Sequence, residues 1–185
     1  ALHTDGHRIT NQHCVAVLMG LCAAGNASLA ENFINHYIRR GLIPSKRAMH
    51  LNLRVLYRIL LAECIETRDA DVATRTFDHV IQNSVQGDTL EFETNCMVRL
   101  HLDRDEEEQA NKYLQRMLDM TPLSVAKPLP LDLAKIYMSY FTESMDTRKA
   151  LKFWQTHSNS IADSPEKLRL GLEAFALAGE SKQDR

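Results

Sequence analysis

Residues 18–45, LMGLCAAGNASLAENFINHYIRRGLIPS, decide the fold class because they contain two helical segments that each end in a sharp break. Gly25 ends the first segment, since glycine adopts the left-handed conformation of a helix terminus without a Cβ clash. Gly41 and Pro44 end the second segment, because proline cannot continue a helix. No residues of a catalytic site lie between the two breaks, which is typical of a structural repeat unit.

The same helix-pair pattern recurs along the chain at steps of 43, 37 and 40 residues. After each break an alanine is followed by side chains three, four and seven positions later, which places all four on one helical stripe. The stripes are Ala30, Phe33, Ile34 and Tyr37; Ala73, Thr76, Phe77 and Val80; Ala110, Tyr113, Leu114 and Met117; and Ala150, Phe153, Trp154 and His157. Trp154 therefore belongs to the predicted core. The step is that of paired-helix solenoids, so we predict an all-α fold, a right-handed α-solenoid of about four to five antiparallel helix pairs.

Nine helices are expected, at residues 10–24, 27–40, 46–67, 70–84, 88–102, 105–119, 131–142, 146–161 and 165–178. Local signals support several ends. Residues 105–108, DEEE, place negative charge at a helix N-terminus, and Ser164-Pro165 combines a capping hydroxyl with a first-turn proline. Gly179 is expected at a left-handed helix end, like Gly25.

The predicted domain organisation is an N-terminal extension at 1–9, a helical repeat domain at 10–178 and a polar tail at 179–185. Residues 121–130 contain three prolines and are expected to form an irregular linker within the repeat domain. No apolar run approaches the roughly 18 residues of a membrane span, so no membrane span is expected. The chain starts at Ala1 rather than Met, which is compatible with a cleaved targeting sequence or a larger parent protein.

The cysteines, Cys14, Cys22, Cys64 and Cys96, contain no C-x-x-C pair and lie in apolar helical contexts. They are predicted to be buried free thiols in a reducing compartment.

The first unit resembles a pentatricopeptide repeat. The residues that carry the resemblance are Gly20-Leu21-Cys22-Ala23-Ala24-Gly25, then Ala30, Phe33, Ile34, Tyr37, Gly41 and Pro44, which fit a 35-residue frame without a gap. The later units match only the general helix-pair pattern. The resemblance implies a protein that binds single-stranded RNA, or a ribonucleoprotein, in organellar transcript processing, stability or translation. It also implies a mitochondrial location, with chloroplast or cytoplasm as alternatives.

In this family each repeat reads one base through a residue of the first helix and the last residue of the repeat. The matching pairs here are Val15 with Ser45, Arg58 with Asp88, and Asn95 with Val125. Valine has no polar side-chain atom, so the first unit cannot read a base by hydrogen bonding.

The basic residues form one group, and the acidic residues follow it. Residues 1–60 carry a net charge of +5, residues 61–120 carry −8 and residues 121–185 carry +1. The candidate binding residues for RNA or an acidic partner are Arg39, Arg40, Lys46, Arg47, Arg54, Arg58 and Asn95. Arg54 and Arg58 are four residues apart and should share a helix face. Guanidinium groups suit phosphate, but a solvated helix edge would show the same pattern.

Motifs of catalysis are missing: there is no P-loop, nucleophile elbow, glycine-rich dinucleotide turn or H-E-x-x-H. His3 and His7 are the only close histidine pair and provide too few ligands for a metal site. We therefore expect no enzymatic activity, no metal and no cofactor. The alternative to RNA binding is a protein–protein interaction scaffold, or a subunit of a larger assembly, whose exposed apolar ends are covered by protein partners.

Overall fold

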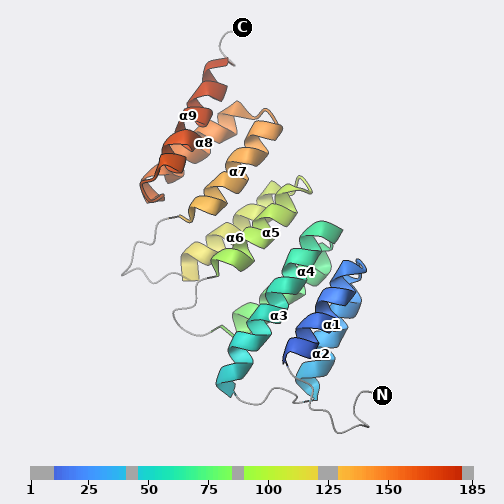
Figure 1. Ribbon diagram of the computed structural model, residues 1–185. Helices are drawn as coiled ribbons and strands as arrows, with labels where there is room; N and C mark the ends of the chain where they lie inside the picture. Colours follow the sequence, from blue (N-terminus) through green and yellow to red (C-terminus); the bar gives the residue numbers. More distant parts are fainter. Residues whose placement is uncertain (1–10, 41–45, 85–89, 121–128, 181–185) are drawn as a thin grey trace. The chain divides into compact units, whose positions relative to one another are not determined.

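The computed structural model describes residues 11–40, 46–84, 90–120 and 129–180, which form nine α-helices and one short 3-10 helix (Figure 1). The helices are α1 (Asn11–Ala23), α2 (Ala27–Arg39), α3 (Lys46–Thr67), α4 (Ala70–Gln82), α5 (Glu91–Leu102), α6 (Glu107–Met120), α7 (Leu131–Glu143), α8 (Thr147–His157) and α9 (Pro165–Glu180), with the 3-10 helix η1 at Ser158–Ser160. These ranges contain no β-strand beyond an isolated bridge between Leu129 and Ile161. The all-α prediction is confirmed.

All helix bounds but one agree with the prediction to within three residues, and the conformation expected at Gly179 differs. The helix expected at 146–161 ends at His157, because the Ser160 hydroxyl donates to the His157 carbonyl and a 3-10 turn follows. Ile161 then pairs with Leu129, and both are buried. Gly179 is not in a left-handed conformation, since α9 continues through it to Glu180. Glycine accepts ordinary helical dihedrals as readily as left-handed ones.

The chain divides into two compact units, residues 1–100 and residues 101–185. In the first unit α1 packs against α2 and α3, and α4 packs against α2 and α3. In the second unit α7, α8 and α9 pack against one another. No helix of the described chain is both long and apolar enough to cross a membrane.

Four turns between paired helices share one backbone conformation. Each contains a single residue with positive φ: Gly25 (67°), Arg68 (54°), Asp105 (58°) and Met145 (55°). At the first turn the Gly25 N–H donates to the Cys22 carbonyl, and the Asn26 N–H donates to the Leu21 carbonyl. The other three turns repeat both bonds at the same offsets, which is the Schellman motif of a helix C-terminus. The left-handed residues lie 43, 37 and 40 residues apart, the same steps as the alanines of the sequence repeat.

Three of the four turns also carry a side-chain cap on the following helix. Asn26, Asp69 and Asp146 each accept a hydrogen bond of 3.0 Å from the backbone N–H three residues later. The cap satisfies one of the unpaired donors in the first helical turn. At α9, Ser164 accepts from the Lys167 N–H at 3.0 Å, as the sequence predicted.

The predicted stripes form the core of the helix pairs. The four alanines, Ala30, Ala73, Ala110 and Ala150, are at most 1% exposed. The bulky members of each stripe are buried or half-buried. Trp154 is 9% exposed and packs against α9, where a Cβ added to Gly171 would lie 2.7 Å from Trp154 Cζ2. Trp154 is thus a core residue, and Gly171 is required for its close approach.

All four cysteines are buried and free. Burial raises the pKa of Cys22 to about 11 and the pKa values of Cys64 and Cys96 to about 12. The thiols therefore stay neutral and pack as small apolar side chains.

Candidate nucleic-acid interface

The first helix of each pair can be numbered backwards from the left-handed residue that ends it. The residues ten positions earlier are Val15, Arg58, Asn95 and Lys135. All four are half-buried, so this position lies at the edge of the core in every pair. The first three are the residues that the pentatricopeptide resemblance assigns to base reading. Their second members, Ser45, Asp88 and Val125, lie outside the described residues.

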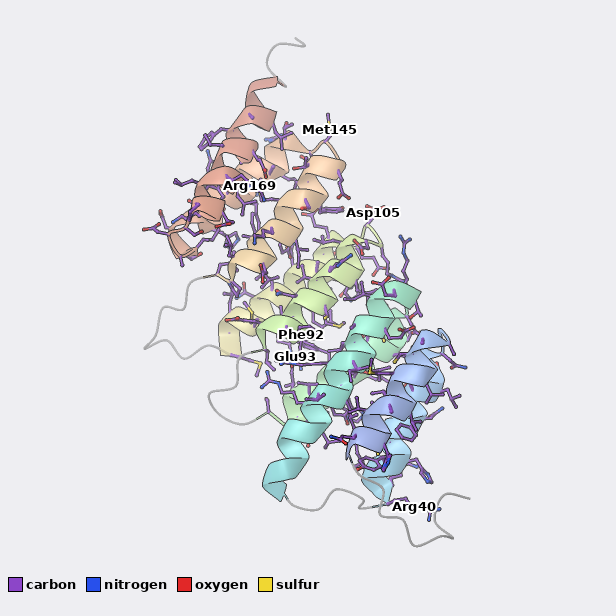
Figure 2. The ribbon with its side chains drawn as sticks, viewed as in Figure 1. Arg40, Phe92, Glu93, Asp105, Met145 and Arg169 are labelled. Atoms are coloured by element: carbon purple, nitrogen blue, oxygen red, sulfur yellow. The ribbon has the colours of Figure 1, made fainter. Side chains whose placement is uncertain are left out.

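Arg54 and Arg58 of α3 meet on one carboxylate, Glu93 of α5. Arg54 Nε lies 2.9 Å from Glu93 Oε1, and Arg58 Nε lies 2.8 Å from the same oxygen. Arg54 also donates from Nη2 to Oε2 at 3.4 Å. The two arginines therefore share a face, as their spacing predicted. We call Arg54, Arg58 and Glu93 the Glu93 cluster; Figure 2 labels Glu93 on α5 where that helix lies beside α3.

Glu93 is fully buried, whereas the arginine side chains are 21% and 40% exposed. Burial alone raises the pKa of Glu93, because it removes water from the charged form. Hydrogen bonds from Arg54 and Arg58 outweigh burial and hold the pKa of Glu93 below its ordinary value. Glu93 therefore remains ionised, and the cluster of two cations and one anion keeps a net charge of +1.

Glu93 occupies a position that two of the other three pairs give to leucine, whereas the first pair has the exposed His13 there. It lies twelve residues before Asp105, and the same position holds Leu56 on α3 and Leu133 on α7, which are 3% and 0% exposed. Sequence reasoning missed Glu93 because a glutamate in a helix is normally a surface residue. Alignment of the first helices on their left-handed residues shows that Glu93 shares the register of these leucines, but not that it is buried against two arginines.

Phe92 presents an exposed aromatic ring next to the cluster. The Arg58 guanidinium carbon lies 5.1 Å from the centre of the Phe92 ring, a cation–π contact. Phe92 is 40% exposed, and Figure 2 labels it beside Glu93 on α5. Arg58 binds Glu93 through Nε, which leaves its planar Nη groups for other acceptors. The sequence analysis did not select Phe92.

Asn95 lies three residues after Phe92, so the two side chains are neighbours on the α5 surface. Its side-chain oxygen Oδ1 is buried and has no hydrogen-bond partner in the described part of the chain. A buried amide oxygen without a donor costs free energy, and Thr76, Thr94 and His101 have buried polar atoms of the same kind.

The other predicted binding residues lie elsewhere. Arg39 and Arg40 are exposed at the C-terminal end of α2, where positive charge complements the helix dipole. Lys46 and Arg47 are the first residues of α3, and their side chains lie outside the described residues. The structure thus brings Arg54 and Arg58 together on Glu93 and places Asn95 on the same helix as Glu93, α5.

Several residues of the acidic stretch have structural roles. Asp69 caps α4. Glu106 accepts from Arg104 Nε at 3.0 Å and lies 2.7 Å from His101 Nδ1, and the hydrogen bond to His101 is the main reason that its pKa is lowered. Glu107 pairs with Lys149 Nζ at 2.6 Å. The negative charge of residues 61–120 is therefore partly balanced within the fold.

No group of three or more metal-ligating side chains occurs among the described residues, and His3 and His7 lie outside them. Comparison of the chain with protein-family models, with curated proteins and with solved structures finds no match.

Proposed function

We propose that this chain is a non-catalytic helical-repeat protein of the pentatricopeptide type, which binds single-stranded RNA in mitochondrial gene expression. The proposal includes a right-handed α-solenoid of about four to five helix pairs, as expected for that family. Its support is the motif of the first unit together with four turns of one backbone conformation at steps of 43, 37 and 40 residues.

The observation that carries RNA binding is the arrangement of Arg58, Phe92 and Asn95. Single-stranded RNA is bound by stacking bases on aromatic rings or guanidinium planes and by hydrogen bonds to base edges. Arg58 and Phe92 are each 40% exposed and lie in cation–π contact, and Asn95 lies three residues after Phe92 on the same helix. Arg58 and Asn95 hold equivalent positions in consecutive helix pairs, as one-base-per-repeat readout requires.

Glu93 sets a limit on the electrostatic part of the binding. It neutralises one of the two arginine charges, so the cluster attracts phosphate less than two free arginines would. Each phosphate contact to a single strand contributes a slope of about −0.7 to the dependence of log affinity on log salt. We expect a slope that corresponds to few phosphate contacts, with stacking as the main source of affinity.

Fluorescence anisotropy with labelled single-stranded RNA oligonucleotides of mixed sequence, titrated over a range of salt concentrations, tests the proposal. Phe92→Ala should weaken binding by roughly 5- to 150-fold, the range for one stacked base. Arg58→Ala should also weaken it. Arg75→Ala is the matched control, since it removes the same charge from an exposed arginine of α4 that pairs with Glu31. No RNA affinity at low salt, or equal losses for Arg58→Ala and Arg75→Ala, would contradict RNA binding at this surface.

A protein-interaction scaffold is the second candidate function. The observation that favours it is a row of exposed apolar side chains on α9, Leu168, Leu172 and Phe175, of which the two leucines are 71% exposed. Contiguous apolar surface of this kind is typical of protein contacts. Absence of RNA binding together with protein association through α9 would favour the scaffold.

A further inference from the structure

Helix α9 has two apolar faces, and only one of them is covered. Leu170, Gly171 and Ala174 are buried on the side that packs against α7 and α8. Leu168 and Leu172 are each 71% exposed, and Phe175 is 57% exposed. We call these three residues the α9 row.

The spacing of the α9 row is that of a helix–helix seam. Its members are separated by four and then three residues, the alternation that places side chains of a coiled coil against a partner helix. An apolar row of this spacing is therefore suited to a second helix, rather than to a flat surface or a small molecule.

The charges beside the row favour a second α9 as the partner. Arg169 and Glu173 follow one edge of the row, where Arg169 Nη1 lies 2.8 Å from Glu173 Oε1. Their side chains are 62% and 40% exposed, so both remain accessible to another chain. A twofold axis near Gly171 and Leu172 would pair two antiparallel α9 helices and bring each Arg169 close to Glu173 of the partner subunit. The edge is thus complementary to itself in the antiparallel orientation, whereas a parallel pair would place like charges together.

We propose that two copies of this chain associate through their α9 rows, antiparallel and related by a twofold axis. The contact is independent of the proposed RNA surface, which lies on α3 and α5. Three apolar side chains from each copy form an interface smaller than the roughly 1,600 Å² of a standard complex. The dimer should therefore be weak and its population should depend on protein concentration.

Sedimentation equilibrium of the 185-residue chain over a wide concentration range measures this association. The expected mass rises from 21.1 kDa toward twice that value as concentration increases. Leu172→Glu should abolish the increase, because it places two like charges in the seam. Met19→Glu is the matched control, since Met19 is a 57% exposed residue of α1, outside the proposed seam, and should leave the association unchanged. Circular dichroism melts verify that both variants remain folded.

Charge reversal tests the orientation. Arg169→Glu alone and Glu173→Arg alone should each weaken self-association by about tenfold, because each puts like charges at both ends of the contact. A mixture of the two variants should restore association, since every contact in the mixed dimer again joins opposite charges. A chain that stays monomeric at all concentrations overturns the proposal. A dimer that is insensitive to Leu172→Glu overturns it too, and failure of the mixture to associate overturns the antiparallel arrangement.

Discussion

Helices α5 and α7 have chemically opposite side chains at the position twelve residues before their left-handed ends. Helix α5 has Glu93 there and α7 has Leu133, and both side chains are fully buried. Glu93 binds Arg54 and Arg58, which lie fourteen and ten residues before the left-handed end of α3. The comparison teaches that the buried carboxylate of α5 is accompanied by two guanidinium partners, whereas the same register position of α7 is filled by an apolar side chain.

Leu133→Glu should have the largest effect, because it places a carboxylate in a fully buried position that leucine now fills. A buried charge without a partner costs several kcal/mol, so we expect a loss of about 3–5 kcal/mol in the free energy of unfolding. Urea denaturation followed by circular dichroism measures it. Leu133→Met is the control, since this volume-conserving change should cost less than about 1.5 kcal/mol. A loss for Leu133→Glu no larger than that of the control would remove the distinction between the two helices.

Glu93→Ala should have the next largest effect, since it leaves Arg54 and Arg58 without their shared acceptor and opens a gap. We expect a loss of about 2–3 kcal/mol, below the range for fully buried pairs because both arginines retain access to water. Glu93→Leu should cost less, because leucine fills the position as in α3 and α7. The same denaturation experiment ranks the two variants. If Glu93→Leu lowered the free energy of unfolding more than Glu93→Ala, then filling the position with an apolar side chain would not stabilise it, and the carboxylate would have a further role.

Acid should reduce the difference between the wild-type chain and Glu93→Leu. The pKa of Glu93 is lowered by its arginine partners from an ordinary value of 4.5, so its ionised form stabilises the folded state above that pH. This contribution is lost as pH falls from 4.5 through the lower pKa of the folded state. Unfolding free energies of both chains, measured from pH 7 downward, should converge in that window. A difference that stays constant with pH would show that Glu93 does not act through its charge.

The side-chain caps should contribute the same free energy to folding in the two units. The difference between the units would then lie in their first helices and not in their turns. Asp69→Ala and Asp146→Ala each remove one side-chain hydrogen bond of 3.0 Å to a helix N-terminus. Each should lower stability by about 1 kcal/mol. Thermal melts of both variants provide the test. Asp132→Ala is the control, since Asp132 is an exposed aspartate that does not cap its helix. Clearly unequal losses would mean that the shared turn geometry conceals different energetics.

Glycine at the later turns should have the smallest effect, and a favourable one. Met145 is exposed at φ 55°, a conformation that costs a residue with a side chain about 1 kcal/mol. Met145→Gly should therefore raise stability by up to about 1 kcal/mol, and Gly25→Ala should lower it by a similar amount. Thermal melts measure both. A loss of stability in Met145→Gly would show that its side chain stabilises the turn.

Sequence reasoning found the helices and their core stripes because both depend on periodic, local patterns. It found the left-handed turn at Gly25 because glycine signals that conformation. At the equivalent turns the left-handed residues are Arg68, Asp105 and Met145, and a left-handed conformation is uncommon for residues other than glycine. The sequence indicated these turns only because each lies five residues before a core alanine.

The site was predicted less completely than the fold. The shared face of Arg54 and Arg58 followed from helical geometry. Their partner Glu93 did not, since it lies 35 to 39 residues away and its burial depends on that contact. Phe92 was missed for a similar reason, because its exposed ring gains significance only next to Arg58.

By itself the sequence determined the all-α class, the helix boundaries to within a few residues and the recurrence of helix pairs, since helical periodicity and local capping operate within one turn of the chain. The tertiary structure alone decided that a glutamate would occupy a leucine position, that two arginines would neutralise it and that one apolar face of α9 would stay exposed. Each of these depends on which side chains from distant helices reach the same place, because burial and charge compensation are set by neighbours in space.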